Sequence, residues 1–209
     1  MADTASSRLI IIGAGGFGRE LLGWIRKYAL PFDFVGFLDN LKSGENILGT
    51  IEGHQPQLGA FYISALGAPA DRHMATSRIE NAGGRFVNIM SPNAMLASTL
   101  PPNAGIIALG DASAANDVKI GRHVLLQTFC AIGHDVTVGD YSTVSSFAFI
   151  GGKARIGALV TIHPHATILP SVVVGDGAVI GAGSVVTRNV AANTTVFGNP
   201  AKLLMRAPH

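Results

Sequence analysis

Aliphatic residues recur at every sixth position through the second half of the chain. From Ile120 to Val186 each sixth residue is Ile, Leu or Val, and the position four residues after each one is small or β-branched. Glycine directly follows the aliphatic residue in most of these hexapeptides. The aliphatic series is Ile120, Leu126, Ile132, Val138, Val144, Ile150, Ile156, Ile162, Ile168, Val174, Ile180 and Val186. An unbroken fixed period of this kind predicts a repeat architecture.

The hexapeptide pattern predicts a left-handed parallel β-helix, in which three hexapeptides form one triangular coil. The aliphatic position fills the interior, the small position lies where the walls crowd, and glycine eases the corner. Residues 120–191 give four complete coils on this basis. Residues 92–119 are interpreted as degenerate leading coils and "NPAKLLMRAPH" as a closing tail. The predicted β-helix domain therefore spans residues 92–209.

The first half of the chain has a different pattern. A buried strand over 8–12 leads through glycines into an amphipathic helix, and a second strand, "FDFVGFLDN", ends in Asp39. A third strand in "GAFYISAL", a helix from Asp71 to Ala82 and a short fourth strand, "RFVNIM", follow. Alternating strands and helices predict a small parallel sheet. We expect an α/β, Rossmann-like half domain over residues 1–91.

The glycine loop between the first strand and helix is a candidate nucleotide site. Gly13, Gly15 and Gly18 match G-x-G-x-x-G in the strand-to-helix context that this motif requires. The glycines allow the backbone to approach a phosphate, and the start of the helix attracts its charge. Asp39 lies where a carboxylate can accept hydrogen bonds from a ribose. A tight turn without a ligand remains the alternative interpretation.

A nucleotide-dependent dehydrogenase is disfavoured by length. Only about 90 residues precede the repeats, roughly one mononucleotide half of a full Rossmann sheet, and no second domain is left for hydride chemistry. One mononucleotide half of a Rossmann sheet is better suited to binding a nucleoside diphosphate sugar than to binding a dinucleotide.

Composition and charge narrow the classes further. Only 13% of the 209 residues are charged, the net charge is +2, and no basic run carries interleaved aromatics, so no nucleic-acid partner is expected. No signal peptide is expected from the first residues, and no apolar stretch approaches the ~20 residues that span a bilayer. A single cysteine, Cys130, cannot form an internal disulfide. We expect a cytoplasmic protein without membrane insertion.

Taken together, these segments resemble a family of bacterial sugar acyltransferases of surface-glycan pathways. The resemblance rests on "IIIGAGGFGRE", "GFLDN", "AIGHD" and "IGAGSVVTRNV", followed by "VFGNPAKLL", and covers nearly the whole chain. The family includes O-acetyltransferases of the sialic acid type and N-acetyltransferases of UDP-4-amino sugars. It implies a homotrimer that binds a nucleotide sugar in the N-terminal domain and acetyl-CoA, as co-substrate, between neighbouring β-helices.

The resemblance also implies roles for individual residues. His134 would be the general base, Asp135 its partner, and Gly152 would offer its backbone N–H to the thioester oxygen. Further residues carried over are Gly13, Gly15, Gly16 and Asp39 at the nucleotide, Gln127 near the sugar, and Thr143 and His163 near acetyl-CoA. The chain departs from the family pattern at two positions, where Phe17 and Thr143 stand in place of histidines.

The chemistry of the histidines fits acyl transfer. A histidine with a pKa of ~6.5 is mostly neutral at cytoplasmic pH and can accept a proton from an amine or hydroxyl. Because a thioester has a good leaving group, no covalent intermediate on Cys130 is needed, and this cysteine is expected to be structural. His163 and His165 are candidates for the acyl-CoA groove and the next candidates for the base. His123 is expected at the surface, whereas His54 and His73 have no partner recognisable from sequence.

Other functions stay open at this point. A zinc hydrolyase on the same β-helix needs three histidines at spacings that are absent here, so no metal is expected. A non-catalytic, trimeric nucleotide-sugar-binding protein is the non-enzymatic alternative, supported by Phe17 and Thr143. The sequence does not distinguish amine from hydroxyl acceptors, one nucleotide from another, or acetyl from larger acyl groups; an amine acceptor is favoured.

Overall fold

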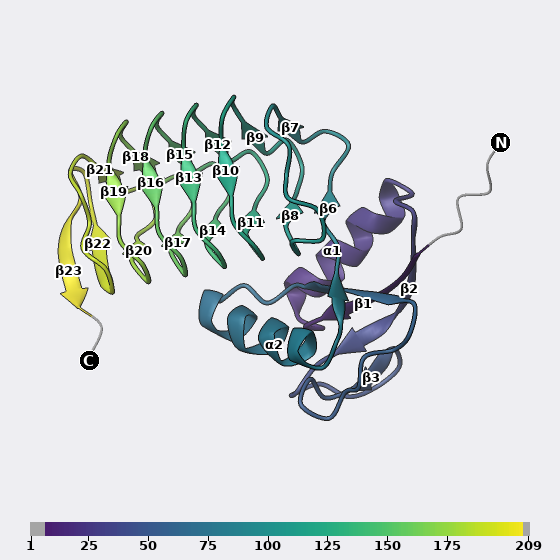
Figure 1. Ribbon diagram of the computed structural model, residues 1–209. Helices are drawn as coiled ribbons and strands as arrows, with labels where there is room; N and C mark the ends of the chain where they lie inside the picture. The colour runs from purple at the N-terminus through teal and green to yellow at the C-terminus, as the bar shows by residue number, and fades with distance from the viewer. Residues whose placement is uncertain (1–6, 207–209) are drawn as a thin grey trace. The chain divides into compact units, whose positions relative to one another are not determined.

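The chain divides into two units, Met1–Asn88 and Ile89–His209. The computed structural model describes residues 7–206, so the expectations for the first six residues and for the last three residues of the tail lie outside the described part. Each unit is considered by itself (Figure 1).

The first unit is built on a five-stranded sheet in which every pair of neighbouring strands is parallel. The strand order is β3-β2-β1-β4-β5, with α1 following β1 and α2 following β4. The elements are β1 (Ser7–Ile12), α1 (Gly16–Lys27), β2 (Phe32–Leu38), β3 (Ile47–Gly49), β4 (Ala60–Ser64), α2 (Pro69–Asn81) and β5 (Arg85–Phe86). The expected parallel α/β sheet is present.

Both helices of the first unit follow from local sequence. α1 buries Leu21, Leu22 and Ile25 on one face, and its last turn carries two cations that complement the helix dipole. α2 begins at Pro69, before the predicted start at Asp71, because proline is pre-organised for the first turn of a helix and needs no hydrogen-bond acceptor there.

The segment "RFVNIM" is not one strand. Arg85–Phe86 pairs with β4 as β5, whereas β6 (Ile89–Met90) pairs with Ile107–Ala108 in the second unit. The chain therefore passes from one sheet to the other within this segment, and the two compact units divide after Asn88. β3 was not predicted, since a three-residue edge strand has no recognisable periodicity.

The second unit is a parallel β-helix of two-residue strands (Figure 1). Three walls are defined by its sheets: wall A is β10-β13-β16-β19, wall B is β6-β8-β11-β14-β17-β20-β22-β23, and wall C is β7-β9-β12-β15-β18-β21. Consecutive strands from β10 to β21 enter walls A, B and C in turn, and Ile132 pairs with Ile150, eighteen residues on. The remaining strands are β7 (Met95–Leu96), β8 (Ile107–Ala108), β9 (Ser113–Ala114), β10 (Lys119–Ile120), β11 (Leu125–Leu126), β12 (Ala131–Ile132), β13 (Thr137–Val138), β14 (Thr143–Val144), β15 (Phe149–Ile150), β16 (Arg155–Ile156), β17 (Thr161–Ile162), β18 (Thr167–Ile168), β19 (Val173–Val174), β20 (Val179–Ile180), β21 (Val185–Val186), β22 (Thr194–Phe197) and β23 (Lys202–Arg206).

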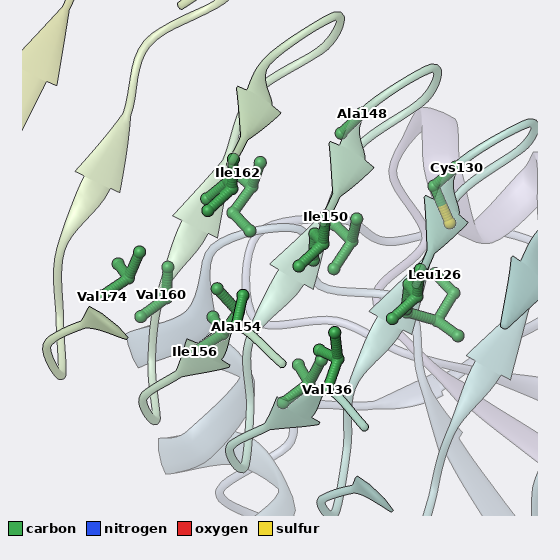
Figure 2. Close-up of a cluster of buried hydrophobic side chains, with 14 of the residues drawn as sticks. Leu126, Cys130, Val136, Ala148, Ile150, Ala154, Ile156, Val160, Ile162 and Val174 are labelled. Atoms are coloured by element: carbon green, nitrogen blue, oxygen red, sulfur yellow. The ribbon is translucent and has the colours of Figure 1, made fainter. Parts of the chain in front are cut away.

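The interior of the β-helix is the predicted one. Every member of the aliphatic series from Ile120 to Val186 is buried, and so is every small residue four positions later. Figure 2 shows part of this column of buried side chains, including Ile150, Ile156 and Ile162. Full burial of one such aliphatic side chain contributes roughly 1.5–3 kcal/mol, so the repeat itself is the main source of stability.

Glycine does not have the predicted role at the corners. The residue in the left-handed conformation is the second one after the glycine, as in Tyr141 with φ 62° after Gly139, and this position is usually not glycine. Gly139 instead permits contact between coils, because a Cβ atom there would lie 2.5 Å from the carbonyl carbon of Gly157. The glycines thus set the close stacking of successive coils.

The C-terminal end of the β-helix changes strand direction. β22 continues wall B in parallel with β20, and β23 then pairs antiparallel with β22. This is the predicted closing tail. Among residues 7–206, no helix combines the length and apolar character that crossing a membrane requires.

Candidate active site

His134 lies at a corner of the β-helix, between β12 on wall C and β13 on wall A. Ile132 and Val136 on either side occupy the interior, whereas the His134 side chain is 61% exposed. Asp135 adopts the left-handed conformation with φ 59°, which aspartate tolerates better than most residues. The fold therefore requires no imidazole at this corner.

Asp135 orients the imidazole. Its Oδ2 lies 2.7 Å from His134 Nδ1. In the tautomer that carries its proton on Nδ1, the Nδ1–H group donates a hydrogen bond to this carboxylate. Nε2 then keeps a free lone pair. The pair therefore presents Nε2 as a proton acceptor.

Gly152, one coil further on, lies against this ring. A Cβ atom at Gly152 would lie 2.7 Å from His134 Nε2, so only glycine leaves room for the ring in this position. The corner is also fixed by the backbone, since Lys153 N–H donates to the His134 carbonyl over 2.8 Å. His134, Asp135 and Gly152 are thus brought together.

The backbone N–H of Gly152 has no acceptor among the described residues. At the equivalent corner position, the N–H of Ala158 donates to the carboxylate of Asp176, eighteen residues on, over 2.8 Å. The residue eighteen positions after Gly152 is Pro170, which has no such carboxylate. An N–H donor beside a free Nε2 is an arrangement that can stabilise a developing oxyanion.

Three other expected site residues lie elsewhere in the chain. Gln127 directly follows β11, Thr143 lies on β14 and His163 directly follows β17, and all three strands belong to wall B. The corner of His134 joins walls C and A. A single chain therefore does not bring these three residues to His134.

The remaining histidines of the second unit and the cysteine differ in burial. His123 is fully buried rather than at the surface. Its ring occupies the space over Gly105 and stacks on Tyr141 with centroids 5.2 Å apart. His165 is exposed and stacks on Phe147 with centroids 4.9 Å apart. Burial raises the pKa of the Cys130 thiol to about 12, in agreement with a structural role.

His54 has a partner that its sequence did not indicate. Its Nε2 lies 2.8 Å from the hydroxyl of Tyr62, within the first unit. Burial, and then the charge of Arg78, lower the pKa of His54. Tyr62 belongs to the hydrophobic core of the first unit, whereas His134 belongs to the second unit.

The glycine loop is held by Asp39. The loop opens with Gly13 at φ 98°, a conformation that favours glycine. Oδ2 of Asp39 accepts from Ala14 N–H at 2.8 Å, and Oδ1 accepts from the N–H groups of Leu41 and Lys42. Burial alone would raise the pKa of Asp39, but these three donors and the Lys42 ammonium lower it. Asp39 therefore ties the loop after β1 to the loop after β2 as an ionised carboxylate.

Packing explains only part of the glycine pattern in this loop. A Cβ atom at Gly18 would overlap the carbonyl oxygen of Gly13, so Gly18 is required for the turn. Gly15, the N-cap of α1, and Gly16 have no atom within 4 Å of an added Cβ. The open backbone at the start of α1 is the geometry that an anion requires.

Two cations beside this loop were missed by the sequence analysis. Arg19 Nη1 and Lys42 Nζ each donate to the carbonyl of Ala14 over 3.1 Å. An arginine in the first turn of a helix opposes the helix dipole, and this was the indication available from sequence. Lys42 is brought to the loop only by the fold.

A pocket of about 490 Å³ adjoins the loop at Gly13 and Asp39. Its size lies in the usual range of ligand pockets, ~300–1,000 Å³. The α2 residues Asp71, Met74 and Arg78 line one side, and Ile51 lines another. The described residues contain no group of three or more side chains placed to hold a metal ion.

Comparison with known proteins first defines a class. Residues 117–152 and 153–188 each match the family model of the bacterial transferase hexapeptide (six repeats). No curated protein matches the chain. The resemblance to hexapeptide-repeat transferases is confirmed for the repeat region.

Solved structures then show particular likenesses. The acetyltransferase domain of PglB from Neisseria gonorrhoeae FA1090 is 24% identical with a TM-score of 0.87, over 95% of this chain and 100% of that chain. PerB from Caulobacter crescentus, solved with CoA and GDP-perosamine, is 20% identical with a TM-score of 0.85, over 94% and 97%. WeeI from Acinetobacter baumannii AYE is 22% identical with a TM-score of 0.55, over 94% and 99%. These likenesses show that the chain shares the fold of these proteins.

Proposed function

We propose that this protein is an acetyl-CoA-dependent N-acetyltransferase that acts on a nucleotide-linked amino sugar in bacterial surface-glycan synthesis. The observation that carries the proposal is the corner where His134, oriented by Asp135, lies against the open N–H of Gly152. Acetyl-CoA as a co-substrate is consistent with the CoA bound to PerB. A cytoplasmic reaction is part of this proposal.

The reaction follows from these groups. The neutral amine attacks the thioester carbonyl, so a C–N bond forms and negative charge develops on the carbonyl oxygen near Gly152 N–H. Nε2 of His134 takes a proton from the amine nitrogen, the C–S bond breaks, and the leaving thiolate receives that proton. General base catalysis of this kind usually contributes about 100- to 10,000-fold in rate.

The first unit is the proposed nucleotide-sugar domain. Its parallel strand order supports a Rossmann-like half domain, and the open glycines Gly15 and Gly16 with Arg19 and Lys42 suit a diphosphate. The 490 Å³ pocket beside Gly13 and Asp39 suits the nucleoside. GDP-perosamine bound to PerB is consistent with a substrate of this class.

A homotrimer completes the proposed site. Gln127, Thr143 and His163 lie on wall B, away from the corner of His134, so a neighbouring copy is needed to bring them to the base and to the acetyl-CoA groove. Light scattering of the active protein would show a trimer, and a stable, active monomer would contradict the shared site.

The function is tested by thiol release from acetyl-CoA with a panel of nucleotide amino sugars. His134→Ala should lower kcat by roughly 100-fold or more with little change in acetyl-CoA affinity, because the lost interaction belongs to the transition state. Its stability should change by less than about 0.5 kcal/mol, as expected for an exposed position. Gly152→Ala should also lower kcat, since the new methyl group displaces the imidazole.

His73→Ala is the matched control, because it removes an exposed imidazole that does not line the pocket beside the glycine loop. It should turn over at the parent rate. A parent rate for His134→Ala, with activity lost in His165→Ala, would place the base elsewhere. If the parent protein binds nucleotide sugars but does not turn them over, the non-catalytic binding function would be supported instead. If it acetylates only hydroxyl acceptors, it would be an O-acetyltransferase.

A further inference from the structure

A polar groove adjoins the corner of His134 on the side opposite to Gly152. The groove has a volume of about 550 Å³ and is lined by Ser98, Asn116, Asp117 and Lys119. Asn116 precedes His134 by one coil, and its carbonyl accepts from Asp135 N–H over 3.1 Å. The base therefore has the open N–H of Gly152 on one side and this groove on the other.

The floor of the groove is fixed by hydrogen bonds. The hydroxyl of Ser98 donates to the Ala115 carbonyl over 3.2 Å and accepts from Val118 N–H over 2.9 Å. These bonds join two successive coils, so the groove is part of the rigid β-helix and does not depend on a flexible loop.

Asp117 differs from Asp135, Asp140 and Asp176, three other carboxylates at the corners of the β-helix. Asp135 is paired with His134, whereas Asp140 and Asp176 accept from backbone N–H groups of the preceding coil. Asp117 is exposed, and the described residues provide no hydrogen-bond or ion-pair partner for its carboxylate. Its left-handed backbone, with φ 60°, places it at the corner, one coil before Asp135.

We propose that Asp117 selects an amine over a hydroxyl acceptor by binding the ammonium form of the amino sugar in this groove. The proposal rests on the acyltransferase function proposed above. Primary amines with a pKa near ~8 are largely protonated at neutral pH, and a carboxylate attracts that charge but gains much less from a neutral hydroxyl. The bound ammonium releases one proton to water, and the neutral amine then leaves Asp117 and attacks the thioester carbonyl, with Nε2 of His134 as the base.

Asp117 is on this basis a specificity-determining residue. Asp117→Asn keeps the shape and a hydrogen-bonding oxygen but removes the charge. Affinity for the nucleotide amino sugar should fall about five- to tenfold, the range of a charge-assisted hydrogen bond at an accessible site. Affinity for the matching nucleotide sugar with a hydroxyl in place of the amine should be unchanged.

Calorimetry of both ligands with the parent protein and the variant tests this directly. The probes are GDP-perosamine, its counterpart with a hydroxyl at the amine position, and the equivalent UDP- and dTDP-linked pairs. Asp111→Asn, on a different corner of the same β-helix, is the matched control and should bind both ligands as the parent does. The KM for the amino sugar should rise with its dissociation constant, while the KM for acetyl-CoA stays constant.

The outcomes separate this inference from the proposed function. Loss of affinity confined to the amine ligand supports the role of Asp117. Equal affinities in variant and parent, or equal losses for both ligands, would overturn it even when acetylation is observed. Binding without acetylation by the parent would contradict the proposed function, and the calorimetric difference would still decide the role of Asp117. A parent that binds none of the pairs would overturn both.

Discussion

The two units use glycine for different purposes. In the β-helix, glycines such as Gly139 and Gly151 lie where a side chain would collide with the backbone of the next coil. In the first unit, Gly15 and Gly16 have open space where a side chain would be. Packing therefore accounts for the repeat glycines but not for these two, and a backbone left open at a helix start is an indication of a ligand.

The largest effect on stability is expected where a repeat glycine is filled. In Gly139→Ala the new Cβ would lie 2.5 Å from the Gly157 carbonyl carbon, so two coils must separate. The free energy of unfolding should fall by roughly 1–3 kcal/mol, measured by denaturant titration of the full chain. Gly15→Ala is the control and should cost less than about 1 kcal/mol, the usual loss when alanine replaces glycine at an N-cap. Equal stabilities for the two variants would mean that the repeat glycines are no more important for packing than the open glycines at the start of α1.

A larger side chain at the open glycine should affect binding and not folding. Gly15→Val fills the space over the start of α1 that we assign to the diphosphate. We expect about tenfold weaker binding of the nucleotide sugar, which corresponds to about 1.4 kcal/mol, and an unchanged melting temperature. Calorimetry and thermal denaturation on the same sample check both. An unchanged dissociation constant would place the nucleotide away from the glycine loop.

The smallest effect concerns Asp39, which holds the same loop by its charge. Its pKa is lowered in the folded protein, so its stabilisation is fully present above the unfolded pKa of ~3.9 and is lost as the pH falls through the folded value. Asp39→Asn should reduce stability by about 1 kcal/mol at neutral pH, with the difference shrinking in that acidic range. Asp33→Asn, an exposed change on β2, serves as the control for denaturation across pH. A difference independent of pH would mean that the charge of Asp39 is unimportant.

The β-helix could be predicted from sequence because each position repeats its environment. The aliphatic positions and the small positions four residues later were correctly predicted as interior from Ile120 to Val190, and the same register placed His134 outside. The degenerate leading coils lacked that register. The burial of His123 could not be foreseen, because it depends on Gly105 lying one coil earlier in a segment without regular hexapeptides.

The first unit was less predictable because its contacts are not periodic. The hydrophobic pattern located β1, β2 and β4, but the convergence of Arg19 and Lys42 on the Ala14 carbonyl joins residues from separate loops and helices. Likewise, the open N–H of Gly152 follows from Pro170 replacing a carboxylate one coil on, a relation visible only once the coils are stacked. The motifs indicated where chemistry occurs, and the fold was needed to show which groups take part.

The reversal of direction at β23 also limits how the molecule can grow. A wall of identical parallel rungs ends in unpaired backbone groups, which are a template for the first rung of another molecule. On wall B that last edge belongs to an antiparallel strand, and its exposed residues include Lys202. A strand of another molecule could not continue the parallel pairing of wall B at this edge. This wall is therefore protected against end-to-end polymerisation into fibres.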